Sequence, residues 1–419
     1  MVGAGDLDRT GLQRRTLRVL IAAQVFGGAG FFLGFAVMAL LARELTDSDS
    51  LIGLPVAIAV AAAAAAAGPF GAWMARSGRR PALVAGQLIA AAGAAGVVLS
   101  ARADSFALVC VAMAAFGVGN ASNLFARYAA SDLSEPERRG RAISFILLAT
   151  AAGAILGPNL ADAAGGLGGE LGVVPEAAPF AVAAGFLCVA AAIIFVLLRP
   201  DPLLAARDAA GIDPAPAPGA PGADAVTVTW SRMALTGAAA IVLANFVMVS
   251  IMTMTPVHLD DAGQSLSVVG LVISLHVAGM FLPSPISGVL VDRVGRLPII
   301  AASGAVLILA GGVALPTSGH DTGLIIAALV LLGIGWNLGL VGGSALLTDS
   351  VPLAVRARAQ GQADMAMGAA GALGSLLSGP ALAAGGFGLL AVAGSFLGGA
   401  LVLVAVRAGL FGAPAAEAT

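Results

Sequence analysis

The sequence has few charged residues. Of its 419 residues only 11% are Asp, Glu, Lys or Arg, and 59% are hydrophobic. Soluble domains carry about 25% charged residues. A chain of this composition has too little polar surface to cover an apolar core in water. We therefore expect an all-α polytopic membrane protein. A large soluble helical protein would need charged stripes at helical spacing, which are absent here.

Other features that define known protein classes are also missing. The two cysteines, Cys110 and Cys188, lie far apart inside apolar runs, which excludes a disulfide framework and a CxxC motif. No basic tract resembles a phosphate-binding surface, so nucleic acid is not an expected partner. No nucleophile–base pair or metal-hydrolase spacing occurs, which argues against an enzyme and against a resident cofactor. The polar residues 1–16 do not have the pattern of a cleaved signal peptide.

Apolar stretches long enough to cross about 30 Å of hydrocarbon recur throughout the chain. We predict twelve transmembrane helices, at residues 17–41, 51–75, 81–101, 105–127, 141–165, 177–198, 232–256, 266–290, 297–315, 323–347, 358–382 and 386–408. Many are rich in alanine and glycine, which suits close helix packing in lipid.

The chain divides near its middle. Residues 199–231 contain a Pro/Ala/Gly-rich core that cannot bury an apolar face, so we predict a flexible or semi-extended cytoplasmic linker there. Residues 1–198 would form an N-terminal six-helix bundle and residues 232–419 a C-terminal one.

Orientation depends on arginine alone, because the sequence contains no lysine. If both termini are cytoplasmic, only Arg43 and Arg102 fall on the outer side. The arginines that then fall on the cytoplasmic side are Arg76, Arg79, Arg80, Arg127, Arg138, Arg139, Arg141, Arg199, Arg207, Arg232, Arg293, Arg296, Arg356, Arg358 and Arg407. The positive-inside rule therefore predicts a multi-pass membrane protein with an even number of helices and both termini cytoplasmic.

An internal repeat relates the two halves. A shift of 217 residues places one loop on another: Gly71, Arg76, Gly78, Arg79 and Pro81 fall on Gly288, Arg293, Gly295, Arg296 and Pro298. The same shift places a second loop in register: Asp132, Arg139 and Arg141 fall on Asp349, Arg356 and Arg358. Two loops in one frame predict two pseudo-symmetric six-helix bundles.

The loop that contains Gly288-Val-Leu-Val-Asp292-Arg293-Val-Gly295-Arg296 resembles the G-x-L-x-D-R-x-G-R signature of the major facilitator superfamily. The resemblance implies a transporter that works by alternating access, and a cytoplasmic gate at Gly288, Asp292, Arg293, Gly295 and Arg296. There a carboxylate at a helix end would pair with arginines and with a facing helix N-terminus. The first half has Ala75 where the second has Asp292, so we expect the complete latch only in the second half.

Groups that bind a substrate inside a membrane should be polar or soft side chains near mid-membrane, because such groups are costly there. Asp162 and Asp364 lie near the ends of predicted helices. The chain has no lysine, and we expect no buried arginine inside a span that could bind an anionic substrate. This argues against an anion exchanger and also weakens a proton relay based on carboxylates.

The seventh and eighth predicted helices contain soft side chains. Met248 and Met252 lie in the seventh helix, and His276 and Met280 in the eighth. Each pair has i, i+4 spacing, so its members share one helix face. At 1.5 Å per residue, Met248 and His276 come to similar depths. Thioethers with an imidazole suit Cu(I) and poorly suit Mg²⁺, Ca²⁺ or Mn²⁺. Packing methionines and a hydrogen-bonded histidine are the structural alternative.

The pattern MxxxM followed by HxxxM resembles that of the CcoA-like bacterial copper importers of the superfamily. The resemblance implies that Met248 and His276 are the main copper ligands and that Met252 and Met280 support them. Copper would be the transported substrate, and the protein a monomer in the lipid of a bacterial cytoplasmic (inner) membrane. The outer end of the seventh helix has Met254 and His258, a candidate first binding step for the incoming ion.

Two other transporter functions stay open. The run from Gly153 to Pro158 resembles the start of the GxxxGPxxGG motif of proton-coupled drug exporters, but Ala161 and Asp162 replace its final glycines. An importer of riboflavin or another small organic nutrient is the second. Five residues would line its cavity or would instead bridge helices by hydrogen bonds: Asn120, Asn123, Asn245, Trp336 and Asn337.

Overall fold

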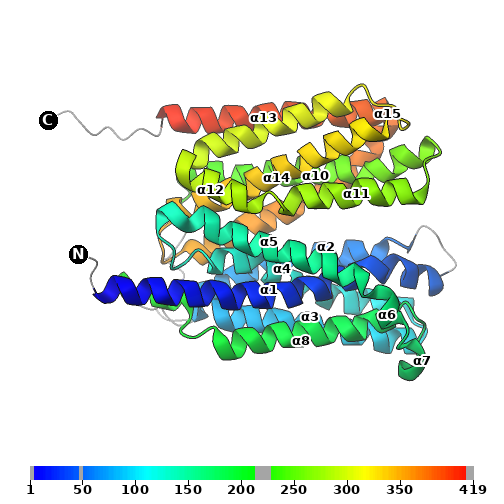
Figure 1. Ribbon diagram of the computed structural model, residues 1–419, viewed down its shortest axis with the longest axis horizontal. Coiled ribbons are helices and arrows are strands. Elements are labelled where there is room, and N and C mark those ends of the chain that lie inside the picture. Colours follow the sequence, from blue (N-terminus) through cyan, green and yellow to red (C-terminus); the bar gives the residue numbers. More distant parts are fainter. Residues whose placement is uncertain (1–3, 47–50, 213–227, 412–419) are drawn as a thin grey trace. The chain divides into compact units, whose positions relative to one another are not determined.

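The computed structural model describes residues 4–46, 51–212 and 228–411, and this part of the chain consists of helices joined by turns and loops, with no β-strand (Figure 1). The main helices are α1 (Ala4–Glu44), α2 (Leu54–Ser77), α3 (Arg79–Arg102), α4 (Phe106–Ala129), α5 (Arg139–Asn159), α8 (Ala178–Leu197), α10 (Arg232–Asp261), α11 (Leu266–Phe281), α12 (Ser284–Val294), α13 (Arg296–Ala314), α14 (Thr322–Ser350) and α15 (Arg356–Phe411). Short helices α6 (Ala161–Gly165), α7 (Gly168–Leu171) and α9 (Pro202–Ala209), with the 3₁₀ turn η2 (Pro136–Arg138), complete the order.

The helices account for the predicted twelve crossings. Within the described residues, 11 helices are long and apolar enough to cross a membrane. The longest of them, α15, has non-helical backbone at Gly385 and Gly386, which divides it into two arms that match the two final predicted helices. The eighth predicted helix is α11 followed by α12, interrupted at Pro283, whose ring removes a backbone N–H donor. The twelve-helix fold is confirmed.

Two single-glycine turns relate the halves. Gly78 alone separates α2 from α3 at φ 85°, and Gly295 alone separates α12 from α13 at φ 108°. A residue with a Cβ is strained at such angles, so each turn needs glycine. The two glycines are equivalent in the 217-residue frame. The repeat that was predicted from the loops therefore extends to their backbone geometry.

The chain forms two compact units. Unit 1 comprises Met1–Glu135, Phe145–Thr227 and Leu353–Met365, and unit 2 comprises Pro136–Ser144, Val228–Pro352 and Ala366–Thr419. Each unit thus includes a short segment from the other sequence half. The two exchanged segments both begin in the loop before a helix, and they start at equivalent positions of the repeat.

Part of the predicted linker is ordered in unit 1. Asp201 accepts hydrogen bonds from the backbone N–H groups of Leu203 and Leu204 and so caps helix α9. Its other oxygen accepts a hydrogen bond from the N–H of Arg80 at 2.6 Å, at the start of α3. The prediction of a flexible segment from residue 199 is therefore wrong for α9. The Pro-rich residues 213–227 lie outside the described residues.

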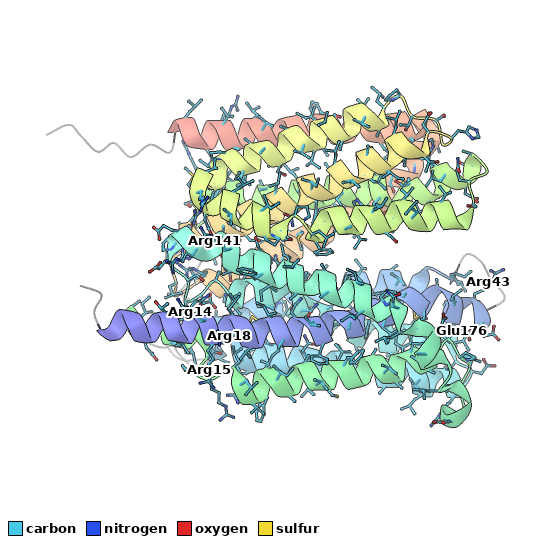
Figure 2. The ribbon with its side chains drawn as sticks, in the orientation of Figure 1. Arg14, Arg15, Arg18, Arg43, Arg141 and Glu176 are labelled. Carbon is cyan, nitrogen blue, oxygen red and sulfur yellow. The ribbon has the colours of Figure 1, made fainter. Side chains whose placement is uncertain are left out.

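Three aromatic rings pack together within the mainly aliphatic core of unit 1. Phe116 of α4 packs against Phe31 of α1 and Phe180 of α8, with ring centroids 5.0 and 5.9 Å apart. Figure 2 shows Arg14, Arg15 and Arg18 toward one end of α1 and Arg43 at the other, where Glu176 also lies. The charged ends of this helix thus flank an apolar span, as expected for a helix that crosses a membrane.

Candidate functional site

Helix α10 packs antiparallel along α14 in unit 2, where the two lie side by side in Figure 1. A Cβ added to Gly343 would lie 3.1 Å from the Cβ of Ala240, and one added to Gly339 would lie 2.7 Å from that of Ala244. The glycines therefore let the two backbones approach closely. These contacts define the register of α10 against α14.

Helix α11 runs parallel to α14 on the same unit. His276 Nδ1 lies 2.7 Å from the carbonyl oxygen of Leu329. One turn further along α11, the carbonyl of Met280 accepts a hydrogen bond from Asn337 Nδ2 of α14 at 2.7 Å. Helices α10 and α11 also contact each other directly. Both predicted ligand helices are thus positioned by α14.

In depth along α14, the four predicted ligands fall within two neighbouring turns of unit 2, and we call this depth range the layer. Counting from the contacts at one step per residue, Met252 and His276 come level with about the same turn of α14. Met248 and Met280 come level with the neighbouring turn, about 6 Å away. The sequence predicted that Met248 lies at the depth of His276, whereas the register puts Met252 there and Met248 one helical turn away.

His276 is hydrogen-bonded through one of its two ring nitrogens. Its side chain is fully buried. A carbonyl oxygen can only accept, so Nδ1 is assigned the proton and Nε2 has the free lone pair. Among the described residues, Nε2 is buried and has no hydrogen-bond partner. Histidines that bind metals commonly donate their other ring N–H to a backbone carbonyl in this way.

The thioethers near this layer are largely shielded. Met248 is 6% exposed and Met280 8%, and Met252 is partly exposed. In the described part of the chain, no three or more His, Cys, Asp or Glu side chains form a group that could hold a metal ion. Any metal site on these two helices would therefore depend on methionine sulfur.

The candidate first binding step lies apart from this layer. The His258 ring stacks on that of Phe387, with centroids 4.4 Å apart and planes 3° from parallel. Its Nε2 is buried without a partner in the described residues. His258 lies ten residues beyond Met248 on α10, which is about 15 Å. Met254 is partly buried between them. These residues would form a second position along one helix.

The polar residues of unit 2 that were considered for an organic cavity bridge helices. Trp336 Nε1 donates to Asn245 Oδ1 at 3.0 Å, and Asn245 Nδ2 donates to the carbonyl of Met367 at 3.0 Å. Asn337 donates to Met280 O and also to Ser284 Oγ, at 2.8 Å. These contacts match the structural alternative that the sequence left open.

Unit 1 contains a set of amides that the sequence reading missed in part. Gln24 of α1 donates to Thr150 Oγ1 at 2.8 Å, and Gln87 of α3 donates to Asn123 Oδ1 at 3.5 Å. A Cβ on Gly27 would lie 3.1 Å from Asn123 Oδ1, so α1 approaches this pair closely. Glutamines inside otherwise apolar predicted helices were the available signal.

In unit 2, Asp292 of the predicted gate motif contacts the N-terminus of a helix. Asp292, near the end of α12, accepts hydrogen bonds from the backbone N–H groups of Gly140 at 2.8 Å and Arg141 at 3.0 Å. These groups open α5, where the helix dipole favours an anion. A Cβ on Gly288 would lie 2.7 Å from the carbonyl oxygen of Gly140, so glycine is required for the contact.

The arginines of the motif differ from each other. Arg296 Nε lies 2.8 Å from Asp349 Oδ2, and Arg139 pairs with the other oxygen of that carboxylate. Arg296 also donates to the carbonyl of Pro136. Arg293 is exposed. Asp349 thus joins the start of α13 to the start of α5 inside unit 2.

The equivalent contact in unit 1 is built differently. A Cβ on Gly71 would lie 2.6 Å from the carbonyl oxygen of Ala357, the repeat image of the contact at Gly288. Ala75 contributes no carboxylate here. Instead Arg207 of α9 donates to the carbonyl oxygens of Ala75 at 2.6 Å and Ala354 at 2.8 Å. Arg207 was predicted only as cytoplasmic positive charge.

Two further arginines are buried in unit 1. Arg79 pairs with both oxygens of Asp132, and Arg127 pairs with Asp364 at 2.5 Å. The expectation of no buried arginine is therefore wrong. These residues lie close to the predicted helix ends, and the sequence did not show that Arg127 and Asp364 would meet.

The glycines of the drug-exporter resemblance serve helix packing. A Cβ on Gly153 would lie 2.6 Å from the backbone nitrogen of Ala29, and one on Gly157 would lie 2.6 Å from its carbonyl oxygen. Helix α5 thus crosses α1 at backbone contact distance within unit 1, which accounts for both glycines without an antiport function.

Comparison with known proteins agrees with this architecture. The profile of the Major Facilitator Superfamily matches residues 19–375. The MFS-type transporter YddS of Bacillus subtilis, itself described as uncharacterized, is 40% identical over 403 residues, which cover 94% of this chain and 91% of that protein. The riboflavin transporter RfnT of Brucella anthropi is 29% identical over 379 residues, 89% of this chain and 90% of that one.

Among solved structures, the transporter FucP in the outward conformation superposes with a TM-score of 0.74 at 14% identity, covering 93% of this chain and 97% of that one. The helices, the repeat and these relatives define a multi-pass secondary transporter rather than an enzyme. The chain belongs to the major facilitator superfamily.

Proposed function

We propose that this transporter imports copper, as Cu(I), through the Met and His side chains of α10 and α11. The observation that supports this most directly is the buried, unpartnered Nε2 of His276. It lies in the layer of unit 2 that also contains Met248, Met252 and Met280. A neutral imidazole with thioethers forms a soft, uncharged ligand set.

The ligand set suits transport as well as binding. Thiolates would hold Cu(I) too firmly for release, whereas neutral sulfur and nitrogen ligands can pass it on. The Nδ1–H bond to Leu329 holds the His276 ring in one orientation, so Nε2 is ready before the ion arrives. His258 and Met254 would receive the ion first at the outer end of α10.

The proposed direction follows from the arginine distribution. With both termini cytoplasmic in a bacterial inner membrane, the Asp292 latch lies at the cytoplasmic end, and α10 ends at the outer face. Copper would enter from outside and leave to the cytosol by alternating access, with the protein acting as a monomer. Cytosolic chelators keep free copper low, so uptake can run downhill.

A second candidate is the import of a small organic nutrient such as riboflavin. Two observations favour it: RfnT is described as a riboflavin transporter, and unit 1 presents the amides of Gln24, Gln87 and Asn123 inside the bundle. Gln87 Oε1 is buried and has no partner within the described residues, so it has a lone pair free for a ligand donor.

The test is uptake by purified protein in proteoliposomes, measured separately with Cu(I), held reduced and with a chelator inside the vesicles, and with riboflavin. His276→Asn keeps an N–H donor for Leu329 and removes the Nε2 ligand. Met248→Leu keeps the volume and removes the sulfur. Copper transport predicts a loss of about tenfold or more in both variants, as expected for a lost metal ligand or its support.

The matched control is Met113→Leu, a fully buried methionine of α4 outside the layer. It should transport copper like the wild type. Wild-type copper uptake in both site variants would contradict the ligand assignment. Saturable riboflavin uptake without copper uptake, reduced by Gln87→Leu, would establish the second candidate instead.

A further inference from the structure

Two arginines of unit 1 bind the same backbone oxygen at the end of helix α8. Arg80, at the start of α3, donates from Nε to the carbonyl oxygen of Phe195 at 3.0 Å. Arg199, just after α8, donates from Nε to that oxygen at 3.4 Å. The two Nε atoms therefore lie within 6.4 Å of each other, the sum of 3.0 and 3.4 Å. Both guanidinium groups also lie over the Phe195 ring, 4.9 and 5.5 Å from its centroid.

These two like charges have no carboxylate between them. Among the described residues, no Asp or Glu forms an ion pair with Arg80 or Arg199, and no oxygen accepts a hydrogen bond from their Nη groups. Asp201 is close along the chain, but its two oxygens accept from backbone N–H groups of α3 and α9. In contrast, Arg79 and Arg127 of the same unit each bind a carboxylate. Arg80 and Arg199 thus present free donors to an anion from outside the protein.

Helix α1 brings a third arginine to the end of α8. A Cβ on Gly34 would lie 3.0 Å from the Phe180 ring, and the rings of Phe26 and Phe186 have centroids 6.0 Å apart. The two helices are therefore antiparallel. Arg15 lies 11 residues before Phe26, which is about three helical turns. It thus shares the α8-facing side of α1 and comes level with the last turn of α8. Arg15 is exposed, and Figure 2 shows it toward that end of α1.

The arginines lie where a membrane span ends. Helix α8 has 20 residues, so it is about 30 Å long, the thickness of the hydrocarbon layer. Its last three residues, Phe195, Val196 and Leu197, are apolar and yet 53%, 58% and 45% exposed. Arg199 follows two residues later. The surface of unit 1 thus changes from apolar to cationic within about one helical turn, which is the depth at which lipid headgroups lie.

The repeat shows that the fold does not require this pair of charges. In the 217-residue frame Arg79 falls on Arg296, and each of them binds an aspartate. The next residue, Arg80, falls on Leu297. Helix α13 therefore begins with an apolar side chain at the position where α3 has its second arginine. A structural need shared by both units explains Arg79 and does not explain Arg80.

We propose that Arg80 and Arg199 bind the phosphate of an anionic phospholipid at the end of α8. Their Nη groups donate to the phosphate oxygens, which planar guanidinium groups bind with particular strength. An acyl chain of the same lipid lies along the exposed apolar residues that end α8. Arg15 adds a third positive charge on the side of α1. The lipid anion supplies the negative charge that the described residues lack, and it joins the start of α3 to the end of α8.

The experiment measures lipid binding to the full-length protein by native mass spectrometry. Dioleoyl phosphatidylglycerol and dioleoyl phosphatidylcholine, which share their acyl chains and differ in net charge, are titrated separately. The wild type should bind the first phosphatidylglycerol more tightly than the first phosphatidylcholine. Arg80→Gln and Arg199→Gln should each weaken the binding of phosphatidylglycerol by about fivefold, the effect of one arginine at a lipid surface. The double variant should bind the two lipids equally.

The matched control is Arg407→Gln, which removes an equal charge from an exposed position of α15. It should bind phosphatidylglycerol like the wild type. Arg199→Lys keeps the charge without the planar donors, so its affinity should lie between those of the wild type and Arg199→Gln. An unchanged affinity in the double variant, or an equal loss in Arg407→Gln, would overturn the proposal. Displacement of the lipid by inorganic phosphate would show that the site takes free phosphate instead.

A second measurement locates the lipid on the wild type, so it does not depend on the folding of a variant. A phosphatidylglycerol analogue with a photoreactive diazirine in its headgroup is added to the protein in phosphatidylcholine nanodiscs. After illumination, labelled peptides should come from the end of α8 and the start of α3, and unlabelled phosphatidylglycerol in excess should remove the label. Labelling spread equally over peptides with other exposed arginines, such as Arg407, would contradict the assignment.

Discussion

The two repeat-related contacts at Gly288 and Gly71 have the same backbone arrangement and opposite charges. In unit 2 the carboxylate of Asp292 binds the N–H groups that begin α5. In unit 1 the guanidinium of Arg207 binds the carbonyl of Ala75, near the end of α2, and that of Ala354. An anion at a helix N-terminus and a cation at a helix C-terminus are both favoured by the helix dipole.

The two units keep the same close contact between a glycine and a backbone carbonyl, while the polar groups beside it differ. The glycine approach is common to both units, because any Cβ would meet a backbone carbonyl. The polar group that completes it is supplied by the motif in one unit and by the linker helix α9 in the other. Where unit 1 has Ala75 instead of an aspartate, the polar contact therefore comes from a different part of the chain.

The largest effect is expected from the repeat-related aspartates. Asp132→Ala leaves Arg79 buried without its carboxylate, so we expect a loss of about 3–5 kcal/mol of stability. Asp349 is 23% exposed, and Asp349→Ala should cost only about 1 kcal/mol. Thermal unfolding in one detergent, with both variants side by side, measures the difference. Equal losses would show that the two positions are energetically equivalent.

Changes at Asp292 and Arg207, which make the polar contacts in the two units, should have intermediate effects on stability. Asp292→Asn removes the charge and places an amide N–H against a backbone N–H, and we expect a loss of about 2–3 kcal/mol. Arg207→Gln keeps one donor for the carbonyls and should lose about 1–2 kcal/mol. Urea-induced unfolding in detergent gives both values. A larger loss of stability from Arg207→Gln than from Asp292→Asn would contradict this order.

The smallest effect concerns the glycine contact itself. Gly71→Ala forces a methyl group to 2.6 Å from the carbonyl oxygen of Ala357, and overpacking of this kind costs about 1–2 kcal/mol. The control is Gly185→Ala in α8, where a Cβ meets nothing within 4 Å, so the gain in helix propensity should stabilise the protein by up to about 1 kcal/mol. Opposite shifts in melting temperature are expected; a loss in the control would show that α8 glycines are also required.

The sequence predicted the helices well because each one is a local pattern. Runs of apolar residues identify a span whatever they pack against, and the 217-residue frame correctly aligned Gly78 with Gly295. The contact of Asp292 with a helix N-terminus was also expected from its motif, and it is present. Each of these features depends on residues that lie close together in the chain.

The features that were missed join distant residues. Arg127 and Asp364 are 237 positions apart, and Arg207 is 132 positions from Ala75. Spacing along the chain says nothing about such pairs. The prediction of depth for the soft side chains was limited in the same way. The i, i+4 spacing indicated a common helix face, but only the register on α14 placed His276 level with Met252 rather than with Met248.

The sequence by itself determined that the chain lies in lipid, how many times it crosses the membrane and that it contains a repeat. Each of these can be recognised from hydropathy or a loop motif within about twenty residues. Only the tertiary structure decided which charges are buried together. A charge inside an apolar bundle is stable only when its partner arrives from another helix. Arg127 with Asp364, and Arg207 with the carbonyls of Ala75 and Ala354, are such partners, and the packing of the helices alone brings them into contact.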